Sequence, residues 1–208
     1  MKSDRIKNLI RILKKHYKPE CALNYKTDFE LLTAVILSAQ CTDTRVNIVT
    51  PELFRKFPDI RAFADADITE LETAVKSTGF YKNKAAAIKS AALDIINKYG
   101  GKMPDTLAEL VKLRGVGRKT ANVVLAEIYG RAEGIVVDTH VKRLSFRIGF
   151  TESREPEKVE IDLMKIVPEK DRIDFAHLLI LHGRAVCKAQ RPLCSVCQIS
   201  NYCEKNEY

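Results

Sequence analysis

The chain has 208 residues, of which 46% are hydrophobic and 30% are charged, and this composition excludes an intrinsically disordered polymer. Its 35 lysine and arginine residues exceed its 27 acidic residues by eight, which favours a polyanionic partner. No apolar stretch approaches the length of about 18 residues that a membrane span needs, so no membrane association is expected.

Helical periodicity begins in a basic N-terminal segment whose apolar residues share one face: Ile6, Leu9, Ile10 and Leu13. A transit peptide has a similar basic pattern, but Asp4 is out of character for one and no cleavage signal follows. We therefore expect a structural helix here, in a cytosolic protein whose thiols stay reduced.

The same periodicity continues through the rest of the chain, and strand-like alternation is nearly absent. Gly100 and Gly101 end one predicted helix, and Thr106 with Glu109 has the spacing of a capping box at the start of the next. Helices are predicted over residues 28–40, 45–57, 68–77, 82–99, 106–113, 120–129, 139–148, 156–166 and 172–187. The sequence thus predicts an all-α fold, and its length permits one large domain or two small lobes.

A glycine-containing turn, L-R-G-V-G-R-K-T over residues 113–120, separates two predicted helices. Gly115 and Gly117 permit positive φ and a close backbone approach, and the N–H groups that open the next helix can bind a phosphate without reading base sequence. A plain helix–helix corner with a glycine cap is the alternative. Local charge favours the phosphate site, because residues 110–150 carry eight basic and three acidic residues.

Two ionisable residues near this turn are candidates for catalysis. Lys119 falls in the first turn of a predicted helix, where the positive end of the helix dipole disfavours a further positive charge. An amine in that position can act as a nucleophile that forms a Schiff base, although a simple phosphate contact is the alternative. Asp138 precedes the helix predicted over residues 139–148, so it is expected to cap that helix and can still present one oxygen to a reacting centre.

Four cysteines gather near the C-terminus in the spacing C-x6-C-x2-C-x5-C: Cys187, Cys194, Cys197 and Cys203. In a reducing compartment this pattern indicates metal ligation rather than disulfides. A single C-x2-C pair with two outlying cysteines suits the footprint of a [4Fe–4S] cluster better than zinc, which stays the alternative. Lys188 and Arg191 lie in the first intercysteine loop, where they are expected to meet phosphates.

Four separated motifs together resemble the endonuclease III family, the bifunctional DNA glycosylases and AP lyases of the helix-hairpin-helix superfamily. They are L-R-G-V-G-R-K-T-A-N-V-V-L from residue 113, V-D-T-H from residue 137, L-S-A-Q-C-T-D from residue 37 and the cysteine tail. The resemblance runs from about residue 20 to residue 203. It implies a two-lobed all-α fold with a DNA-binding cleft between the lobes: a six-helix barrel over residues 22–131, and a lobe of residues 1–21 with 132–208 that holds a [4Fe–4S] cluster.

The resemblance also implies a reaction and a substrate. Lys119 matches the family's catalytic lysine, which attacks C1′ of a damaged nucleoside, and Asp138 matches the aspartate that assists it. Schiff-base formation then permits β-elimination of the 3′ phosphate. The implied substrate is double-stranded DNA that contains oxidised pyrimidines or abasic sites, with the damaged base flipped out of the stack.

Further DNA contacts follow from the same resemblance. Gln40 matches the residue that fills the gap left by the flipped base, and Phe80 falls where the family presents an apolar wedge, more commonly leucine. Gly115, Gly117 and Arg118 belong to the phosphate-binding hairpin. Arg114 stands where a proline is expected, which loosens the turn because proline would fix φ there. The resemblance implies a monomer in the prokaryotic cytoplasm, associated with the nucleoid.

Two other readings compete with this one. A monofunctional adenine or mismatch-thymine glycosylase would keep the hairpin, the aspartate and the cysteines but usually lacks a lysine at position 119. A non-catalytic DNA-binding module with zinc at its cysteines would bind DNA but would not cleave it at damage.

Overall fold

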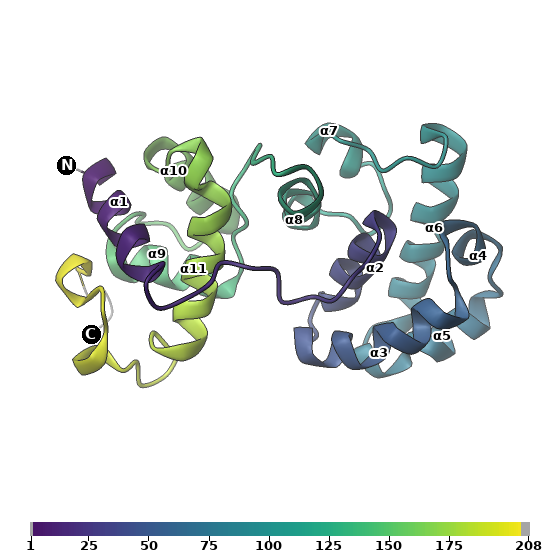
Figure 1. Ribbon diagram of the computed structural model, residues 1–208, viewed down its shortest axis with the longest axis horizontal. Coiled ribbons are helices and arrows are strands. Elements are labelled where there is room, and N and C mark those ends of the chain that lie inside the picture. Colours follow the sequence, from purple (N-terminus) through teal and green to yellow (C-terminus); the bar gives the residue numbers. More distant parts are fainter. Residues whose placement is uncertain (1, 205–208) are drawn as a thin grey trace. The chain divides into compact units, whose positions relative to one another are not determined.

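The computed structural model describes residues 2–204, and within that range every regular element is a helix (Figure 1). The all-α prediction is therefore confirmed. None of these helices is both long enough and apolar enough to cross a bilayer. The chain divides into two compact units, Cys21–Arg131, called here the central unit, and Met1–Glu20 with Ala132–Tyr208, called here the terminal unit.

The central unit is built from seven α-helices and a 3-10 turn. They are α2 (Asp28–Ser38), α3 (Asp43–Lys56), α4 (Ile60–Asp65), α5 (Ile68–Val75), η1 (Lys76–Thr78), α6 (Tyr81–Tyr99), α7 (Leu107–Leu110) and α8 (Arg118–Tyr129). The helix α6 packs against α4 and α5, while α2 packs against α3, α6 and α8. Eight of the eleven residues of α2 are buried, which explains why its sequence is an almost continuous apolar run.

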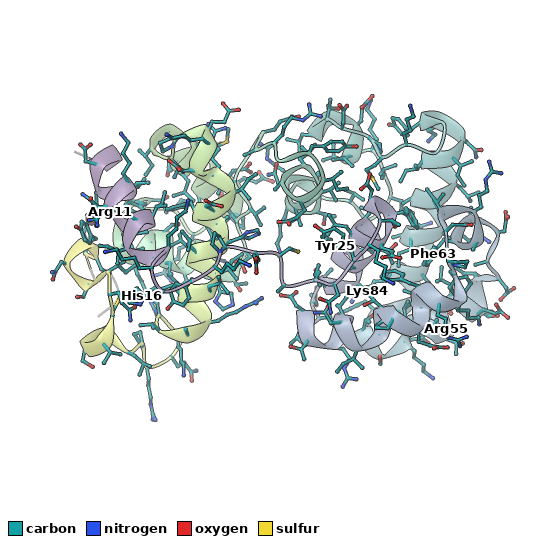
Figure 2. All side chains as sticks on the ribbon, in the orientation of Figure 1. Arg11, His16, Tyr25, Arg55, Phe63 and Lys84 are labelled. Carbon is teal, nitrogen blue, oxygen red and sulfur yellow. The ribbon has the colours of Figure 1, made fainter. Side chains whose placement is uncertain are left out.

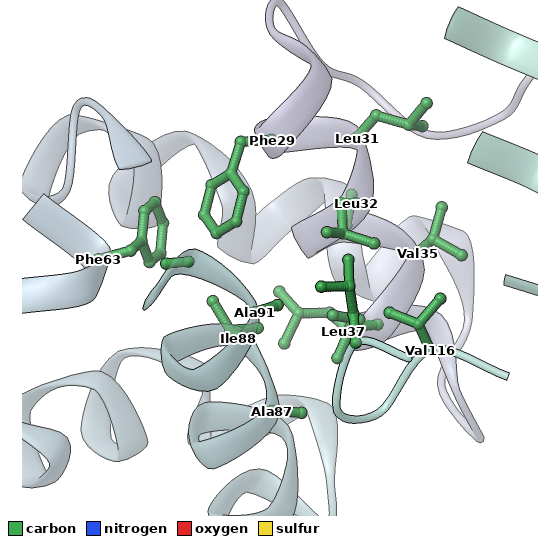
Figure 3. Close-up of a cluster of buried hydrophobic side chains, with 14 of the residues drawn as sticks. Phe29, Leu31, Leu32, Val35, Leu37, Phe63, Ala87, Ile88, Ala91 and Val116 are labelled. Carbon is green, nitrogen blue, oxygen red and sulfur yellow. The ribbon is translucent and has the colours of Figure 1, made fainter. Parts of the chain in front are cut away.

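The core of the central unit is closely packed and partly aromatic. Phe63 lies in its interior (Figure 2), edge-on to Phe29 with ring centroids 5.3 Å apart. Figure 3 shows Leu37 of α2, Ala87 of α6 and Val116 of the glycine turn in the same cluster of buried side chains. The glycine turn is thus anchored on a core made by α2 and α6.

The terminal unit joins the N-terminal helix to the last third of the chain. Its elements are α1 (Lys2–Leu13), α9 (Thr139–Ile148), α10 (Pro156–Ile166), η2 (Glu169–Asp171), α11 (Arg172–Ala185), η3 (Cys194–Val196) and η4 (Ser200–Tyr202). The helix α1 packs on α10 and α11, and its apolar residues Ile6, Leu9 and Leu13 are fully buried. The prediction of a structural basic helix is therefore confirmed.

The helix bounds differ from the predicted ones in instructive places. The six-residue helix α4 was not predicted, because it is shorter than two helical turns and its start depends on Asp59, whose side chain accepts a hydrogen bond from the Ala62 N–H at 2.8 Å. The helix predicted over residues 28–40 ends at Ser38, because Ala39 leaves the helical region with ψ 116° and Gln40 follows with a positive φ. The helix predicted over residues 106–113 ends at Leu110, where the chain tightens into the glycine turn.

Candidate active site

The glycine turn of the central unit is a closed four-residue turn. The Val116 N–H donates to the Leu113 carbonyl oxygen at 3.1 Å, and Gly115, the third residue, has φ +79°. Positive φ at that position is the pattern of a type II turn, whose second position favours proline. Arg114 occupies the second position here, and the turn closes without a proline. A Cβ on Gly115 would lie 2.5 Å from the Ala87 Cβ, so this position requires glycine.

The second glycine does not behave as predicted. Gly117 has φ −83° and ψ 173°, which is extended backbone, and a Cβ there would meet no atom within 4 Å. Its importance therefore lies elsewhere: Gly117 is the N-cap residue of α8 and has no side chain to bond the helix's first-turn amides. The positive end of the α8 dipole is left for an anion to approach, which supports a phosphate-binding role for the hairpin.

Lys119 is the second residue of α8, one position after Arg118, and its side chain is exposed. Its ammonium group makes no ion pair or hydrogen bond with any of residues 2–204. Within the central unit, Lys119 is therefore an accessible amine directly after the glycine turn.

Asp138 caps α9 in the terminal unit, as the sequence predicted. One carboxylate oxygen, Oδ1, accepts a hydrogen bond from the Val141 N–H at 2.7 Å, and the side chain is half-buried. The cap holds the carboxylate in one rotamer while Oδ2 accepts no hydrogen bond from the described part of the chain. Asp138 belongs to the terminal unit and Lys119 to the central unit.

His140 is the second residue of α9, two positions after Asp138, and it contacts α11. Its Nδ1 is 3.1 Å from Nη2 of Arg143, and a Cβ on Gly183 would lie 2.8 Å from that same nitrogen. Burial lowers the pKa of His140, with Arg143 and Arg184 acting in the same direction and Asp138 opposing them. The local environment of His140 thus favours the neutral form of its ring.

Left-handed backbone angles mark three of the predicted DNA-contacting residues. Gln40, Phe80 and Arg191 have φ of 52°, 48° and 52°, and they are the non-glycine residues with positive φ within residues 2–204. This conformation costs about 1–2 kcal/mol per residue, and such strain clusters at functional sites. Phe80 is also 63% exposed, which is unusual for a large apolar side chain. The same three positions are thus singled out by the motifs and by the backbone.

The four predicted metal ligands line one cavity in the terminal unit. Cys187, Cys194, Cys197 and Cys203 surround it together with apolar side chains of α9 and of the segment that follows α11. Within residues 2–204, no three cysteine, histidine or acidic side chains converge closely enough to hold a single metal ion. Four thiol groups around one cavity are a donor set that fits a thiolate-bound metal centre.

A buried arginine stands beside this cavity. Arg147 of α9 is 5% exposed, and its Nη1 lies 3.5 Å from the Cys187 sulfur. The guanidinium also donates to the Lys188 carbonyl oxygen at 2.7 Å and to the Ala189 carbonyl oxygen at 2.9 Å. A thiolate-ligated cluster in this cavity would place negative charge next to the guanidinium, which would favour both groups.

Arg143 also donates to backbone carbonyl oxygens inside the protein. Its Nη2 donates to the carbonyl oxygen of Cys187 at 2.9 Å and to that of Gly183 at 3.1 Å. In the central unit, Arg131 pairs with Asp105 at 2.8 Å. At least three of the eight basic residues between positions 110 and 150 therefore have partners inside the protein. These contacts use part of the local charge excess within the protein, whereas Lys188 and Arg191 are exposed.

A histidine that the motifs did not identify also contacts the cysteine cavity. His182 is fully buried, with Nδ1 3.1 Å from the Tyr17 hydroxyl and Nε2 3.4 Å from the Cys197 sulfur. Burial lowers the pKa of His182 to about 4, so the ring is neutral and one nitrogen donates while the other accepts. No sequence signal pointed to it, because a lone histidine in an apolar helix reads as a core residue.

Comparison with known proteins places this chain among DNA repair proteins. Residues 33–169 match the model of the HhH-GPD superfamily of base excision DNA repair proteins. Endonuclease III of Synechocystis sp. is 49% identical over 203 residues, which cover 97% of this chain and 93% of that protein. Endonuclease III of Escherichia coli K12 is 39% identical over 99% of this chain and 97% of its own length.

Solved structures of endonuclease III also match this chain. A non-covalent endonuclease III–DNA complex is 41% identical with a TM-score of 0.91, covering 98% of this chain and 95% of that one. A trapped endonuclease III–DNA covalent intermediate has the same identity and TM-score, covering 98% and 96%. A thermostable thymine-DNA glycosylase, 20% identical with a TM-score of 0.86, shares the fold.

Proposed function

The chain belongs to the endonuclease III family of the HhH-GPD superfamily, and from this membership we infer that it is a base excision repair enzyme, a DNA glycosylase that is also an AP lyase. The local geometry of Lys119 supports the assignment of the nucleophile most directly. It is an exposed amine without an internal partner, and it directly follows the glycine turn that can hold a DNA phosphate.

We propose that the reaction runs through a covalent bond to Lys119. Its neutral Nζ attacks C1′ of the damaged nucleoside, the N-glycosidic bond breaks, and the base leaves with the bonding electron pair and takes up a proton. Opening of the sugar ring gives a Schiff base between Nζ and C1′. Loss of a proton from C2′ then expels the 3′ phosphate and nicks the strand.

Asp138 has two tasks in this proposal. Its carboxylate stabilises the positive charge that develops on the sugar as the base departs, and it accepts the proton that Lys119 must lose. The N-cap hydrogen bond through Oδ1 fixes the side chain in advance, so that no rotamer entropy is lost when the substrate binds.

The remaining proposed DNA contacts are of two kinds, those with phosphates and those with the base stack. The hairpin residues Gly115, Gly117 and Arg118 hold a phosphate on the strand that is cut, and Lys188 and Arg191 contact phosphates from the cysteine loop. Gln40 fills the space of the flipped base and Phe80 wedges into the stack. The larger phenyl ring in place of leucine makes that wedge bulkier.

The proposed substrates are oxidised or ring-saturated pyrimidines and abasic sites in double-stranded DNA, acted on by a monomer at the nucleoid in the bacterial cytoplasm. Single-turnover cleavage of duplexes that carry thymine glycol, 5,6-dihydrouracil, an abasic site or no lesion tests this range. Base release and nicking are expected at the first two, nicking at the abasic site, and neither in the undamaged duplex. Equal rates on undamaged thymine, or binding without cleavage, would contradict the proposal.

Endonuclease III proteins are generally associated with an iron–sulfur cluster. We propose that Cys187, Cys194, Cys197 and Cys203 hold a [4Fe–4S] cluster, which would close the intercysteine loop through four Fe–S bonds. The buried guanidinium of Arg147 would offset its negative charge, and the hydrogen bond that this guanidinium donates to the Lys188 carbonyl oxygen would hold the first intercysteine loop in place. The cluster's role in this proposal is structural.

Metal content separates the cluster from zinc. Purified protein should be yellow-brown and should contain about four iron atoms per chain. Cys197→Ala should lose both colour and iron, whereas Cys21→Ala, which removes a half-buried thiol of the central unit, should keep them. A colourless wild-type protein with stoichiometric zinc would refute the assignment.

A further inference from the structure

Lys84, in the first turn of α6, is a buried charge that the proposed chemistry leaves unused. Its side chain is 5% exposed and lies among the helices of the central unit (Figure 2). Its Nζ donates to the carbonyl oxygen of Leu37 at 2.8 Å and to that of Thr78 at 2.7 Å. No carboxylate of the described residues pairs with it, and burial lowers its pKa. Burying an ammonium group on carbonyl oxygens alone is costly, so a purpose beyond core packing is expected.

The two carbonyl groups belong to residues that lie shortly before two residues with positive φ. Leu37 is three positions before Gln40, and Thr78 is two positions before Phe80. The backbone N–H of Lys84 adds a third bond, to the Phe80 carbonyl oxygen at 3.1 Å. One residue of α6 therefore fastens two turns that come from segments far apart in the sequence.

Both turns need such fastening. A left-handed conformation is unfavourable for a residue with a side chain, and it persists only where the surroundings over-determine it. Gln40 and Phe80 are exposed, so their own side chains supply no packing that would hold them there. Glycine precedes Phe80, which makes that turn still more pliable.

We propose that Lys84 is a positioning residue that holds Gln40 and Phe80 together in the conformation in which both enter the duplex. This inference rests on the DNA-contacting roles proposed above for those two residues. Lys84 itself is too deeply buried to touch DNA. It acts by holding the wedge residue Phe80 and the gap-filling residue Gln40 in one rigid arrangement. The stack is then opened and the gap is filled in a single step.

The test compares two substrates, of which only one requires Gln40 and Phe80 to enter the duplex. Cleavage of a lesion duplex requires the stack to be opened, whereas lyase action on a single-stranded oligonucleotide with an abasic site has no stack to open and no opposite base. Lys84→Met keeps the length of the side chain but removes the three donors. It should lower the single-turnover rate on the duplex about ten- to a hundredfold, and should change the single-stranded rate by less than about twofold.

The matched control is Lys98→Met, which removes an exposed lysine of the same helix that is paired with Asp94, and it should change neither rate. Gln40→Ala and Phe80→Ala should each lower the duplex rate alone, and if they do not, their proposed DNA contacts are wrong. If both alanine variants lower the duplex rate, the result for Lys84→Met decides the positioning role. A Lys84→Met variant whose rate falls equally on both substrates, or falls on neither, overturns that role. In a double variant with Phe80→Ala, Lys84→Met should cost less than it does alone, and full additivity would also contradict the inference.

Discussion

Lys119→Ala should abolish strand cleavage at abasic sites while DNA binding is largely kept. The variant removes the only proposed nucleophile, and loss of a nucleophile costs about a thousandfold or more in rate. Because the Lys119 side chain is exposed and has no partner inside the protein, its removal should leave stability nearly unchanged. Single-turnover nicking of an abasic-site duplex, together with a thermal melt, measures both effects.

Two control variants distinguish a nucleophilic role of Lys119 from a role in phosphate binding. Lys119→Arg keeps the positive charge, so a residue that only binds phosphate would retain most of its activity, whereas a Schiff-base nucleophile would lose it. Arg118→Ala should weaken DNA binding and make it less dependent on salt, yet should leave the rate of the bound complex within about tenfold of the wild type. Comparable activity of Lys119→Arg and wild type would contradict the assignment.

Asp138→Asn should lose about 10²- to 10⁴-fold in base release with no loss of stability. Asparagine is as good an N-cap as aspartate, so the hydrogen bond from Val141 is kept while the negative charge is removed. Asp138→Ala should lose the same activity and in addition about 1 kcal/mol in the free energy of unfolding, because the cap is lost as well. The rate of release of thymine glycol and urea denaturation of both variants check these values.

The pair of variants is informative because the two functions of Asp138 predict different patterns. If the residue were only a cap, Asp138→Asn would be fully active and Asp138→Ala would be impaired only through its stability. An active Asp138→Asn would therefore remove the carboxylate from the mechanism.

The elements that were predicted well are those with strong local signals. The helices α9 and α10 begin and end at the predicted residues, because Asp138 caps one, Gly149 ends it, and Pro156 opens the other. The glycine turn and the cysteine loop were identifiable for the same reason, since each is contained in fewer than about 20 consecutive residues with a distinctive spacing. Such features need no knowledge of tertiary structure.

The features that were missed depend on contacts between distant segments. A lysine in the pattern of α6 reads as a solvated residue, and only the fold brings the Lys84 amine to carbonyl groups of α2 and η1. Arg147 likewise counts as surface charge in the sequence but is enclosed by the cysteine loop. The positive φ of Gln40, Phe80 and Arg191 has no sequence signature, because none of the three is glycine.

Mapping of the covalent intermediate tests the central claim most directly. Wild-type protein incubated with an abasic-site duplex and sodium borohydride should form a stable protein–DNA adduct, because reduction converts the Schiff base to a secondary amine. Digestion and mass spectrometry should then locate the sugar remnant on Lys119. An adduct on a different lysine or on the N-terminal amine, or equal trapping of Lys119→Ala, would contradict the mechanism proposed here.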